Sequence, residues 1–216
     1  MLTRSRYQKS LKSPSEFTVL KPGKNNSKLG YKITKGKWKG KYIYSLTIEE
    51  RVTCPTTCHH WEDCYGNNMP FAHRFKHGQE LEQKLDYEIG ELVYKHSKGI
   101  LVRLHVLGDF YSSDYVFFWG SLLDKHPTLC IYGYTARYDD SIGSAIALFG
   151  ILHTNRFDIR YSKNKNYSEA TQFQYAADES FSGEFFDCPE QTGQVDSCAD
   201  CAACWQSTKT VRFLSH

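Results

Sequence analysis

The stretch ILVRLHVLGDF, residues 100–110, decides how this chain folds. Its first eight residues are mostly apolar, and the run ends at Gly108 and Asp109. Such a run is typical of a strand that is buried on both faces of a parallel sheet. The stretch LCIYGYTA, residues 129–136, has the same character. We therefore expect these two segments to be central strands of one sheet.

Segments with helical periodicity lie between the expected strands. In QELEQKLDYEIGELVYKHS, residues 79–97, apolar side chains recur at helical spacing, and Lys98 and Gly99 end the run. Ser113 can cap a second helix, which Pro127 closes off. The expected helices are 79–97, 114–125 and 141–154, and the expected strands are 42–48, 100–107, 129–136 and 157–162, the first of them ending a hairpin that begins near Leu29.

This alternation predicts an α/β fold of right-handed βαβ units around a parallel sheet, either open or curled into part of a (βα) barrel. Functional side chains in such folds gather where the strands end at their carboxyl termini. We divide the chain into a basic N-terminal arm (1–28), an α/β domain (29–180) and a cysteine-rich C-terminal segment (181–216). The strand ends to consider are the loop from Cys54 to Cys64, Gly108 to Phe110, Tyr134 to Arg137, and Arg160 to Ser162.

The charge of the chain is small but uneven. The net charge is +3, yet residues 1–41 carry 12 Lys and Arg side chains against the single acid Glu16. A basic arm of this kind can bind nucleic acid or another acidic partner. The alternative is an irregular, solvated N-terminus, and the composition leaves both interpretations open.

The expected cellular compartment indicates what the eight cysteines do. No apolar run reaches the roughly 18 residues that a membrane helix needs, and residues 1–17 have no apolar core of a secretory signal. We therefore expect a cytoplasmic protein without a membrane span. In a reducing cytosol, clustered thiols are metal ligands more often than structural disulfides.

The first cysteine motif follows the first expected strand directly. TCPTTCHHWEDC places Cys54, Cys58 and Cys64 at C-x3-C-x5-C spacing. Three thiolates on one loop can hold three corners of a [4Fe-4S] cluster and leave the fourth iron open. Zinc usually takes separated C-x2-C pairs, so it fits this spacing less well and stays the alternative metal. His59 and His60 lie inside the loop and could add a ligand.

The second motif is a complete ligand set by itself. CPEQTGQVDSCADCAACW carries Cys188, Cys198, Cys201 and Cys204, and its C-x2-C-x2-C run is common around iron-sulfur clusters. Zinc is again the alternative, and the spacing leaves open whether the two motifs hold two clusters or share one. The eighth cysteine, Cys130, falls inside an apolar strand, where we expect it to be part of the core.

Four further residues are candidates because of their positions in or beside the expected strands. Among the carboxylates, Asp109 is the one that we expect to be catalytic. The alternative is that Asp109 only stabilises a turn or caps a helix. For His105 we expect a buried core position. Arg137 and Arg160 could bind a carboxylate or phosphate, or form ordinary salt bridges.

A three-cysteine loop after the first strand, then a helix, then a strand that ends in a Gly-acidic pair resembles the radical S-adenosylmethionine (SAM) architecture. The resemblance covers roughly residues 42–163 and implies that the open iron binds the amino and carboxylate groups of SAM. Gly108 and Asp109 would then stand where that family binds the amino group, and Ser162 would be near the ribose. The departures are the family's C-x3-C-x2-C spacing and a chain that supplies only four or five expected strands instead of six.

The combination of CPTTC, CYGN, RLHVLGDFYS, YGYTAR and the terminal C-x2-C-x2-CW is similar to the gene-product-88 domain family of bacteriophages. This resemblance implies a phage-encoded, viral iron-sulfur protein in the host cytoplasm. The expectation is therefore a partial parallel barrel that binds one or two [4Fe-4S] clusters, with SAM or electron-transfer chemistry. The rival is a zinc- or cluster-stapled nucleic-acid-binding module without catalysis.

Overall fold

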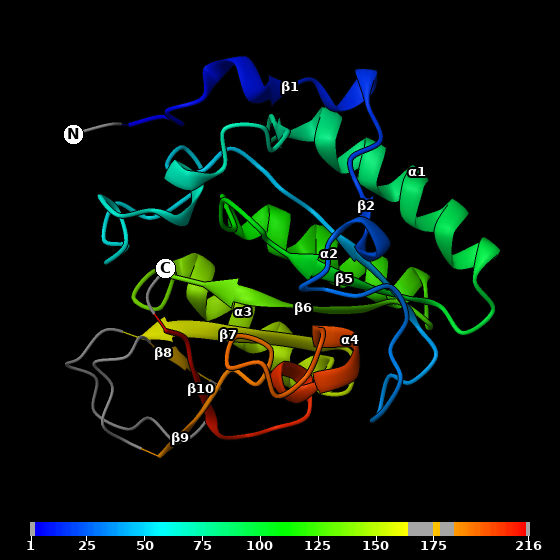
Figure 1. Ribbon diagram of the computed structural model, residues 1–216. Coiled ribbons are helices and arrows are strands. Elements are labelled where there is room, and N and C mark those ends of the chain that lie inside the picture. The colour runs from blue at the N-terminus through cyan, green and yellow to red at the C-terminus, as the bar shows by residue number, and fades with distance from the viewer. Residues whose placement is uncertain (1–2, 164–174, 178–183, 215–216) are drawn as a thin grey trace.

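The computed structural model describes residues 3–163, 175–177 and 184–214 and shows a mixed α/β protein with one mostly parallel sheet (Figure 1). Among the described strands of this sheet, the edge strand β2 alone is antiparallel to its neighbour. The expected boundary between residues 180 and 181 lies outside the described residues. In spatial order the strands are β2 (Lys21–Pro22), β3 (Tyr42–Ser45), β5 (Ile100–Leu104), β6 (Cys130–Thr135), β7 (Phe157–Lys163), β8 (Tyr175–Ala177), β10 (Thr210–Arg212) and β9 (Phe185–Asp187).

The three expected helices are present, with small differences at their ends. They are α1 (Gln79–Lys95), α2 (Ser113–Lys125) and α3 (Ser141–Leu152), and a fourth, α4 (Cys198–Cys201), lies in the cysteine-rich segment. The cap of α2 is Ser112, one residue before the expected Ser113, because its hydroxyl accepts from the Tyr115 N–H at 3.1 Å. Among the described residues, no helix combines the length and the apolar character needed to cross a bilayer.

Shorter elements complete the chain. The strands β1 (Leu11–Lys12) and β4 (Arg74–Phe75) form a separate parallel pair. The 3-10 helices are Gln8–Ser10, Pro14–Glu16, Gly23–Asn25, Tyr65–Asn68 and Ala203–Trp205.

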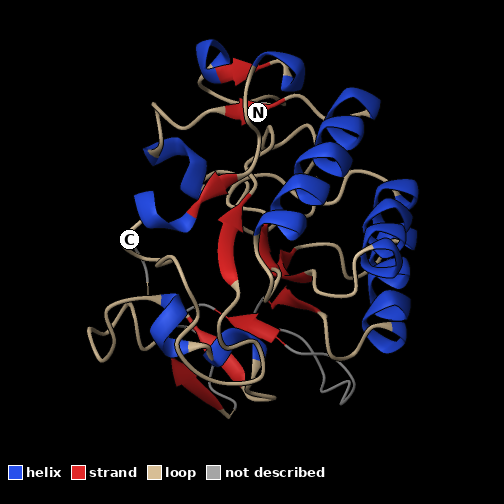
Figure 2. Cartoon of the chain, turned by 90° about the vertical axis from the view of Figure 1, so that its right-hand side faces the viewer, coloured by secondary structure: helices blue, strands red, loops and turns tan. Residues whose placement is uncertain are grey.

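The helices α1, α2 and α3 cover one face of the sheet, and the strands follow an arc that opens away from them (Figure 2). Val102 and Leu104 of β5 belong to the large apolar core on this face, which also contains Trp119 of α2. Leu101 lies between them in sequence and belongs to a second core on the opposite face. Side chains alternate between the two faces of a strand, so β5 is buried twice, as its sequence predicts.

The opposite face is covered by residues from both ends of the chain. Its core joins Leu101 and Tyr132 of the sheet to Trp38 near the N-terminus and Trp205 near the C-terminus. The rings of Trp38 and Trp205 are stacked with centroids 5.7 Å apart. The segment that contains the second cysteine motif therefore lies directly on the sheet.

The sheet is wider than the sequence predicts. Beyond the four expected strands, the described residues add β8, β9 and β10, all parallel to their neighbours. The expectation of four or five strands is therefore wrong. Each added strand has only three residues, which is too few for a period-2 pattern to stand out.

The N-terminal segment is packed, contrary to the interpretation of a solvated arm. Val19 and Leu20 are buried, and the buried carboxylate of Glu88 on α1 accepts from the N–H groups of both. Arg4 forms two hydrogen bonds of 3.1 Å with the carboxylate of Glu49. Deleting residues 1–41 would also remove Trp38 and so expose the core on both faces.

Gly133→Ala is expected to destabilise the fold, because the added methyl group would collide with the backbone carbonyl of Leu104 on β5. Overpacking of this kind costs about 1–3 kcal/mol, and each kcal/mol lowers the melting temperature by about 2–4 °C in a chain of this size. The control is Gly150→Ala on α3, where no neighbouring group lies within 4 Å of the new methyl. Equal melting temperatures for G133A and the wild type would contradict the close approach of β5 and β6.

Candidate metal centres

The first cysteine loop begins at the carboxyl edge of the sheet, where three strand ends hold it. The Thr53 hydroxyl donates to the Glu49 carbonyl at 2.7 Å and accepts from the Asp109 N–H at 3.1 Å. From the end of β6, the guanidinium of Arg137 donates to the Thr53 carbonyl at 2.9 Å. Cys54 is therefore fixed where β3, β5 and β6 end.

The far end of the loop rests on a buried ion pair. Arg74 donates to Glu50 at 2.7 Å and to the carbonyl of Gly66 at 3.0 Å, just after the third cysteine. Ser5 of the N-terminal segment also donates to Glu50, at 2.8 Å. Because both ionic groups are buried and satisfied by further hydrogen bonds, this pair fixes the loop rather than leaving a charge unpaired.

Cys54, Cys58 and Cys64 form one electrostatic group. Burial raises the pKa of all three thiols, that of Cys58 to about 11, and their mutual repulsion as thiolates adds to the effect on Cys54 and Cys58. The carboxylate of Asp109 raises the pKa of Cys54 and Cys58 further. Without a metal ion or cluster these thiols are neutral at pH 7, so binding of metal would release their protons.

Arg51 is a residue of this site that the sequence analysis missed. It is 5% exposed, and its Nε and Nη1 atoms have no hydrogen-bond partner among the described residues. Its Nη2 donates to Asn67 at 2.9 Å, and its charge lowers the pKa of the Cys64 thiol in part. Buried donors without acceptors are costly, so their presence beside Cys64 fits a site built for an anionic sulfur-rich group.

Asp109 is 3% exposed and holds strand ends together. Its carboxylate accepts from Thr135 Oγ1 at 2.7 Å and from the N–H groups of Phe110 and Ala136 at 2.8 Å each. Burial raises its pKa to about 6 although these hydrogen bonds lower it in part. Gly108 before it has φ +83, and a Cβ there would collide with Ile48.

The other candidates lie in different environments. His105 is buried on the helix side, where its Nε2 lies 3.2 Å from the Tyr115 hydroxyl, so the expected core position is confirmed. Cys130 is 1% exposed and belongs to the second core, also as expected. Ser162 follows Arg160 by two residues on β7 and so lies on the opposite face, away from α1, α2 and α3. No contact described for Ser162 joins it to the first cysteine loop.

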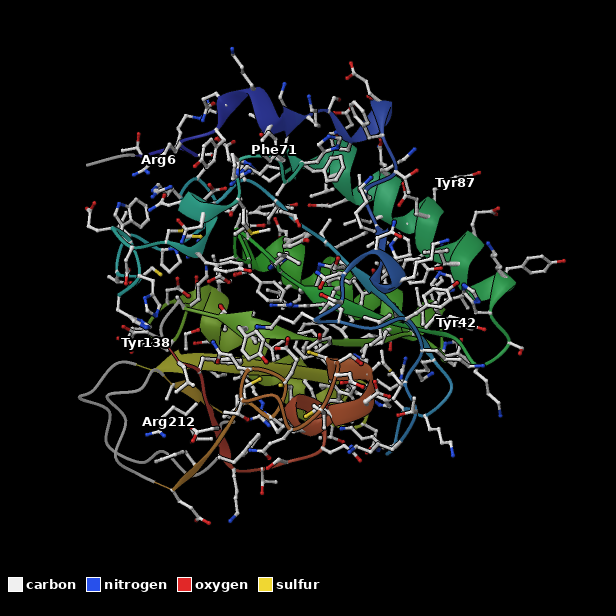
Figure 3. The ribbon with its side chains drawn as sticks, in the orientation of Figure 1. Arg6, Tyr42, Phe71, Tyr87, Tyr138 and Arg212 are labelled. Atoms are coloured by element: carbon white, nitrogen blue, oxygen red, sulfur yellow. The ribbon has the colours of Figure 1, made fainter. Side chains whose placement is uncertain are left out.

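The loop after β6 contributes one aromatic residue to the first site. Tyr138 lies at the edge where the strands end (Figure 3). Burial raises its pKa, and the negative charges of Asp139 and of Cys58 as a thiolate add to this effect. Within the cysteine loop, His60 is 3.2 Å from the Asp63 carboxylate. That contact occupies Nδ1 of His60.

The second cysteine set lies on the face of the sheet opposite the long helices. The N–H groups of Cys198 and Ala199 donate to the carbonyls of Lys28 and Leu29 at 2.7 and 2.9 Å. The N–H of Cys188 donates to the Arg212 carbonyl of β10 at 2.9 Å. Both ends of the chain and the added strands therefore position this set.

The thiols of the second set also act as one group. Burial, together with the charges of Cys204 and Cys188, raises the pKa of Cys198 to about 12. The Tyr134 hydroxyl donates to Cys204 Sγ at 2.9 Å. In Figure 1 the first loop lies near the carboxyl end of β6, whereas α4 lies beside β7, so the two sets occupy different regions of the molecule.

No three His, Cys, Asp or Glu side chains within the described ranges surround one point where a single metal ion could bind. A [4Fe-4S] cluster does not need its ligands to surround one point, because each thiolate binds a different iron at a separate corner of the cluster.

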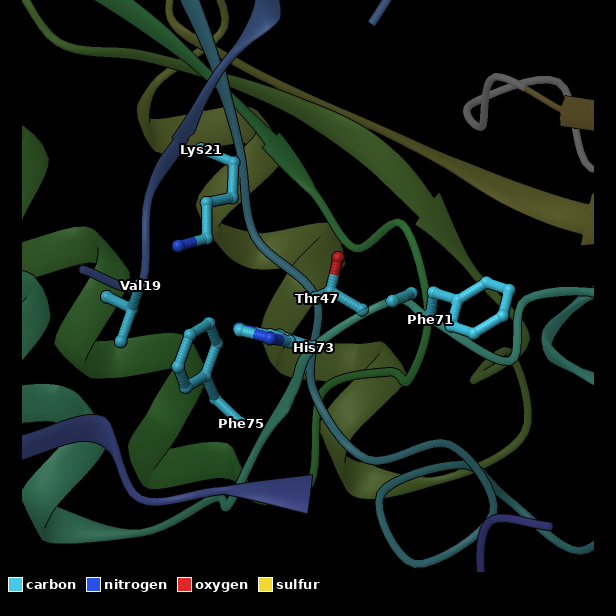
Figure 4. A pocket seen from close by; sticks show the side chains of 7 residues that line it. Val19, Lys21, Thr47, Phe71, His73 and Phe75 are labelled. Atoms are coloured by element: carbon cyan, nitrogen blue, oxygen red, sulfur yellow. The ribbon is translucent and has the colours of Figure 1, made fainter. Parts of the chain in front are cut away.

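A pocket away from both sets lies between the N-terminal segment and the residues that follow the first loop (Figure 4). It is lined by Val19, Lys21, Thr47, Phe71, Ala72, His73 and Phe75. Burial and the charges of Lys21 and Lys12 lower the pKa of His73, so this ring is neutral at pH 7. No cysteine lines the pocket, which is therefore separate from the metal centres.

Comparison of the chain with models of protein families, with curated proteins and with solved structures finds no match in any of the three. The assignment of function therefore depends on the two cysteine sets and the residues around them.

Asp109→Asn is expected to lower the melting temperature. The new amide nitrogen would replace an acceptor of a buried N–H group, and an unsatisfied buried group costs about 1–3 kcal/mol. Glu91→Gln is the control, because Glu91 is exposed on α1. Unchanged stability of D109N would mean that the carboxylate is not needed to join the strand ends, which would favour a role toward a ligand.

Proposed function

We propose that this chain is an iron-sulfur protein in which Cys54, Cys58 and Cys64 hold a [4Fe-4S] cluster with one open iron, and in which the C-terminal cysteines hold a second metal group. The observation that carries the proposal is the grouping of three half-buried thiols on one loop at the carboxyl edge of a parallel sheet. Function in α/β sheets gathers at that edge.

The donor set supports iron and sulfur over oxygen-binding metals. Thiolates favour iron-sulfur clusters and zinc, and the first loop offers three of them where a structural zinc site needs four protein ligands. Nε of Arg51 is a buried donor without an acceptor and can donate to sulfide or thiolate sulfur beside Cys64, whereas Nη1 lies 4.0 Å from the Glu50 carboxylate. Zinc has no such additional sulfur atoms to use this donor.

The proposal includes a partial barrel of the radical SAM type with SAM at the open iron. The curved parallel sheet in Figure 2 and the cysteine loop at its carboxyl edge support it. A reduced cluster of this kind supplies the electron that cleaves bound SAM. The chain's own part would be to hold SAM beside Gly108 and to exclude water at the strand ends.

The structure limits what Asp109 can do in that role. Three donors already occupy its carboxylate oxygens, so we expect it to position the loop that faces SAM rather than to bind the amino group alone. Arg137, whose guanidinium donates to the Thr53 carbonyl, and the ring of Tyr138 are further groups beside the first cysteine loop on this edge.

The test is the content of iron, acid-labile sulfide and zinc in protein purified without oxygen. We expect about eight irons and eight sulfides per chain if both sets hold [4Fe-4S] clusters, and about four irons and four sulfides if only one set does. A variant with C54S, C58S and C64S, here called the loop variant, should lose about four of each. Cys130→Ala is the matched control, since this buried thiol belongs to neither set, and it should lose none.

Binding of SAM is tested on the reduced protein by electron paramagnetic resonance. We expect SAM to change the signal of the wild-type protein and leave the loop variant unchanged. Zinc without sulfide in the wild type would overturn the iron-sulfur assignment and leave the metal-stapled module in its place. A full complement of iron with no response to SAM would retain the cluster and overturn the SAM proposal.

A further inference from the structure

Two buried polar groups on the sheet have no partner among the described residues. They are Nε of Arg103 on β5 and the hydroxyl of Tyr132 on β6. The two residues are register partners across the β5–β6 ladder, so they lie side by side on the same face. Tyr132 is only 2% exposed, so its hydroxyl has no access to bulk water.

Both groups face the C-terminal cysteines. The charges of Cys198 and Cys204 as thiolates act on both the Arg103 guanidinium and the Tyr132 hydroxyl. Cys188 acts on Tyr132 as well. The neighbouring Tyr134 already donates to Cys204 Sγ at 2.9 Å, which shows how a tyrosine on this face meets the sulfur atoms.

A buried donor is stable only when it finds an acceptor, and a buried cation needs a compensating negative charge. Cys198 and Cys204 pack against the core that contains Tyr132, but a protonated thiol is only a weak hydrogen-bond acceptor. Ligation of a metal group turns them into thiolates and creates the missing charge and acceptors. An iron-sulfur cluster adds sulfide atoms as further acceptors.

We propose that Arg103 and Tyr132 donate hydrogen bonds to the sulfur atoms of an iron-sulfur cluster held by Cys188, Cys198, Cys201 and Cys204, and thereby raise its reduction potential. This inference rests on the proposed function, and it assigns the second cluster the role of an electron relay. One-electron reduction adds a negative charge to the cluster, so a cation and hydrogen-bond donors at the sulfurs stabilise the reduced form.

The test is a potentiometric titration with dithionite as the reductant, in the full-length loop variant, so that only the C-terminal cluster is titrated. Tyr132→Phe removes one hydroxyl and keeps the ring, and Arg103→Gln removes the charge. We expect each to lower the ratio of reduced to oxidised cluster about tenfold at a given potential, a shift of about 59 mV for one electron. Arg103→Lys should restore part of the shift that R103Q produces.

The matched control is Tyr115→Phe. The hydroxyl of this buried tyrosine is hydrogen-bonded to Nε2 of His105, 3.2 Å away, on the opposite face of the sheet. It therefore cannot reach the C-terminal cysteines. We expect Y115F to leave the midpoint potential unchanged. Iron and sulfide are measured in every variant, which separates a change in potential from a failure to fold or to load the cluster.

The outcomes separate the inference from the proposed function. A loop variant that keeps about four irons and four sulfides, with Y132F and R103Q at the wild-type potential, would overturn the inference and leave the iron-sulfur assignment intact. Zinc without sulfide in the loop variant would also overturn the inference. If the wild type contained iron that the loop variant lacked, the first cluster would still be supported. Absence of sulfide from the wild type would overturn the proposed function itself.

Discussion

The buried guanidinium of Arg160 is the constraint on which the second half of the structure depends. Arg160 is completely buried on β7, and it donates to the backbone carbonyls of Cys204, Ser207 and Lys209. Arginine has five N–H donors and no acceptor, so its burial is stable only where several acceptors converge. Backbone carbonyls five residues apart meet at one side chain because the chain wraps around it. The last cysteine is thereby fixed against the sheet, and the chain continues into β10.

The two faces of the sheet have different partners, and this difference produces the site. On one face β5, β6 and β7 meet apolar helices, and on the other they meet the cysteine-rich segment. The alternation of side chains lets β5 present Val102 to the helices and Arg103 to the cysteines. A strand that is buried twice therefore serves both as core and as one wall of the candidate metal centre.

The sequence predicts the elements well where the pattern is long. The periodicity of 79–97 and the apolar run at 100–107 correspond to α1 and β5. The membership of the two cysteine sets as metal ligands stays a prediction from the spacing of the cysteines. The sequence predicts less well what depends on tertiary contacts, such as the packing of Val19 and Leu20, because their N–H groups are satisfied by Glu88 from a distant helix.

Arg103 and Tyr132 illustrate why the second half of the site could not be predicted. Each stands in an apolar run that indicates burial, and nothing in the run indicates which segment covers the face on which they lie. That segment is identified by tertiary contacts, among them the hydrogen bonds of Arg160 and the stacked rings of Trp38 and Trp205. Side chains alternate between the two faces of β5 and β6, so those contacts and this alternation together identify Arg103 and Tyr132 as the residues that face the C-terminal segment.

The two cysteine sets are held by different parts of the chain, and this bears on how metal and folding are coupled. The first loop is anchored at both ends by groups that do not involve metal, namely Thr53 and the Glu50–Arg74 pair. The second set has only four residues of α-helix around it and depends on backbone contacts with Lys28 and Leu29. A protonated thiol is only a weak acceptor, so without metal this set leaves the buried Nε of Arg103 without a strong hydrogen-bond partner. Under the proposed function, metal binding at this set would stabilise the fold of the C-terminal segment, whereas the first loop would retain its frame without metal.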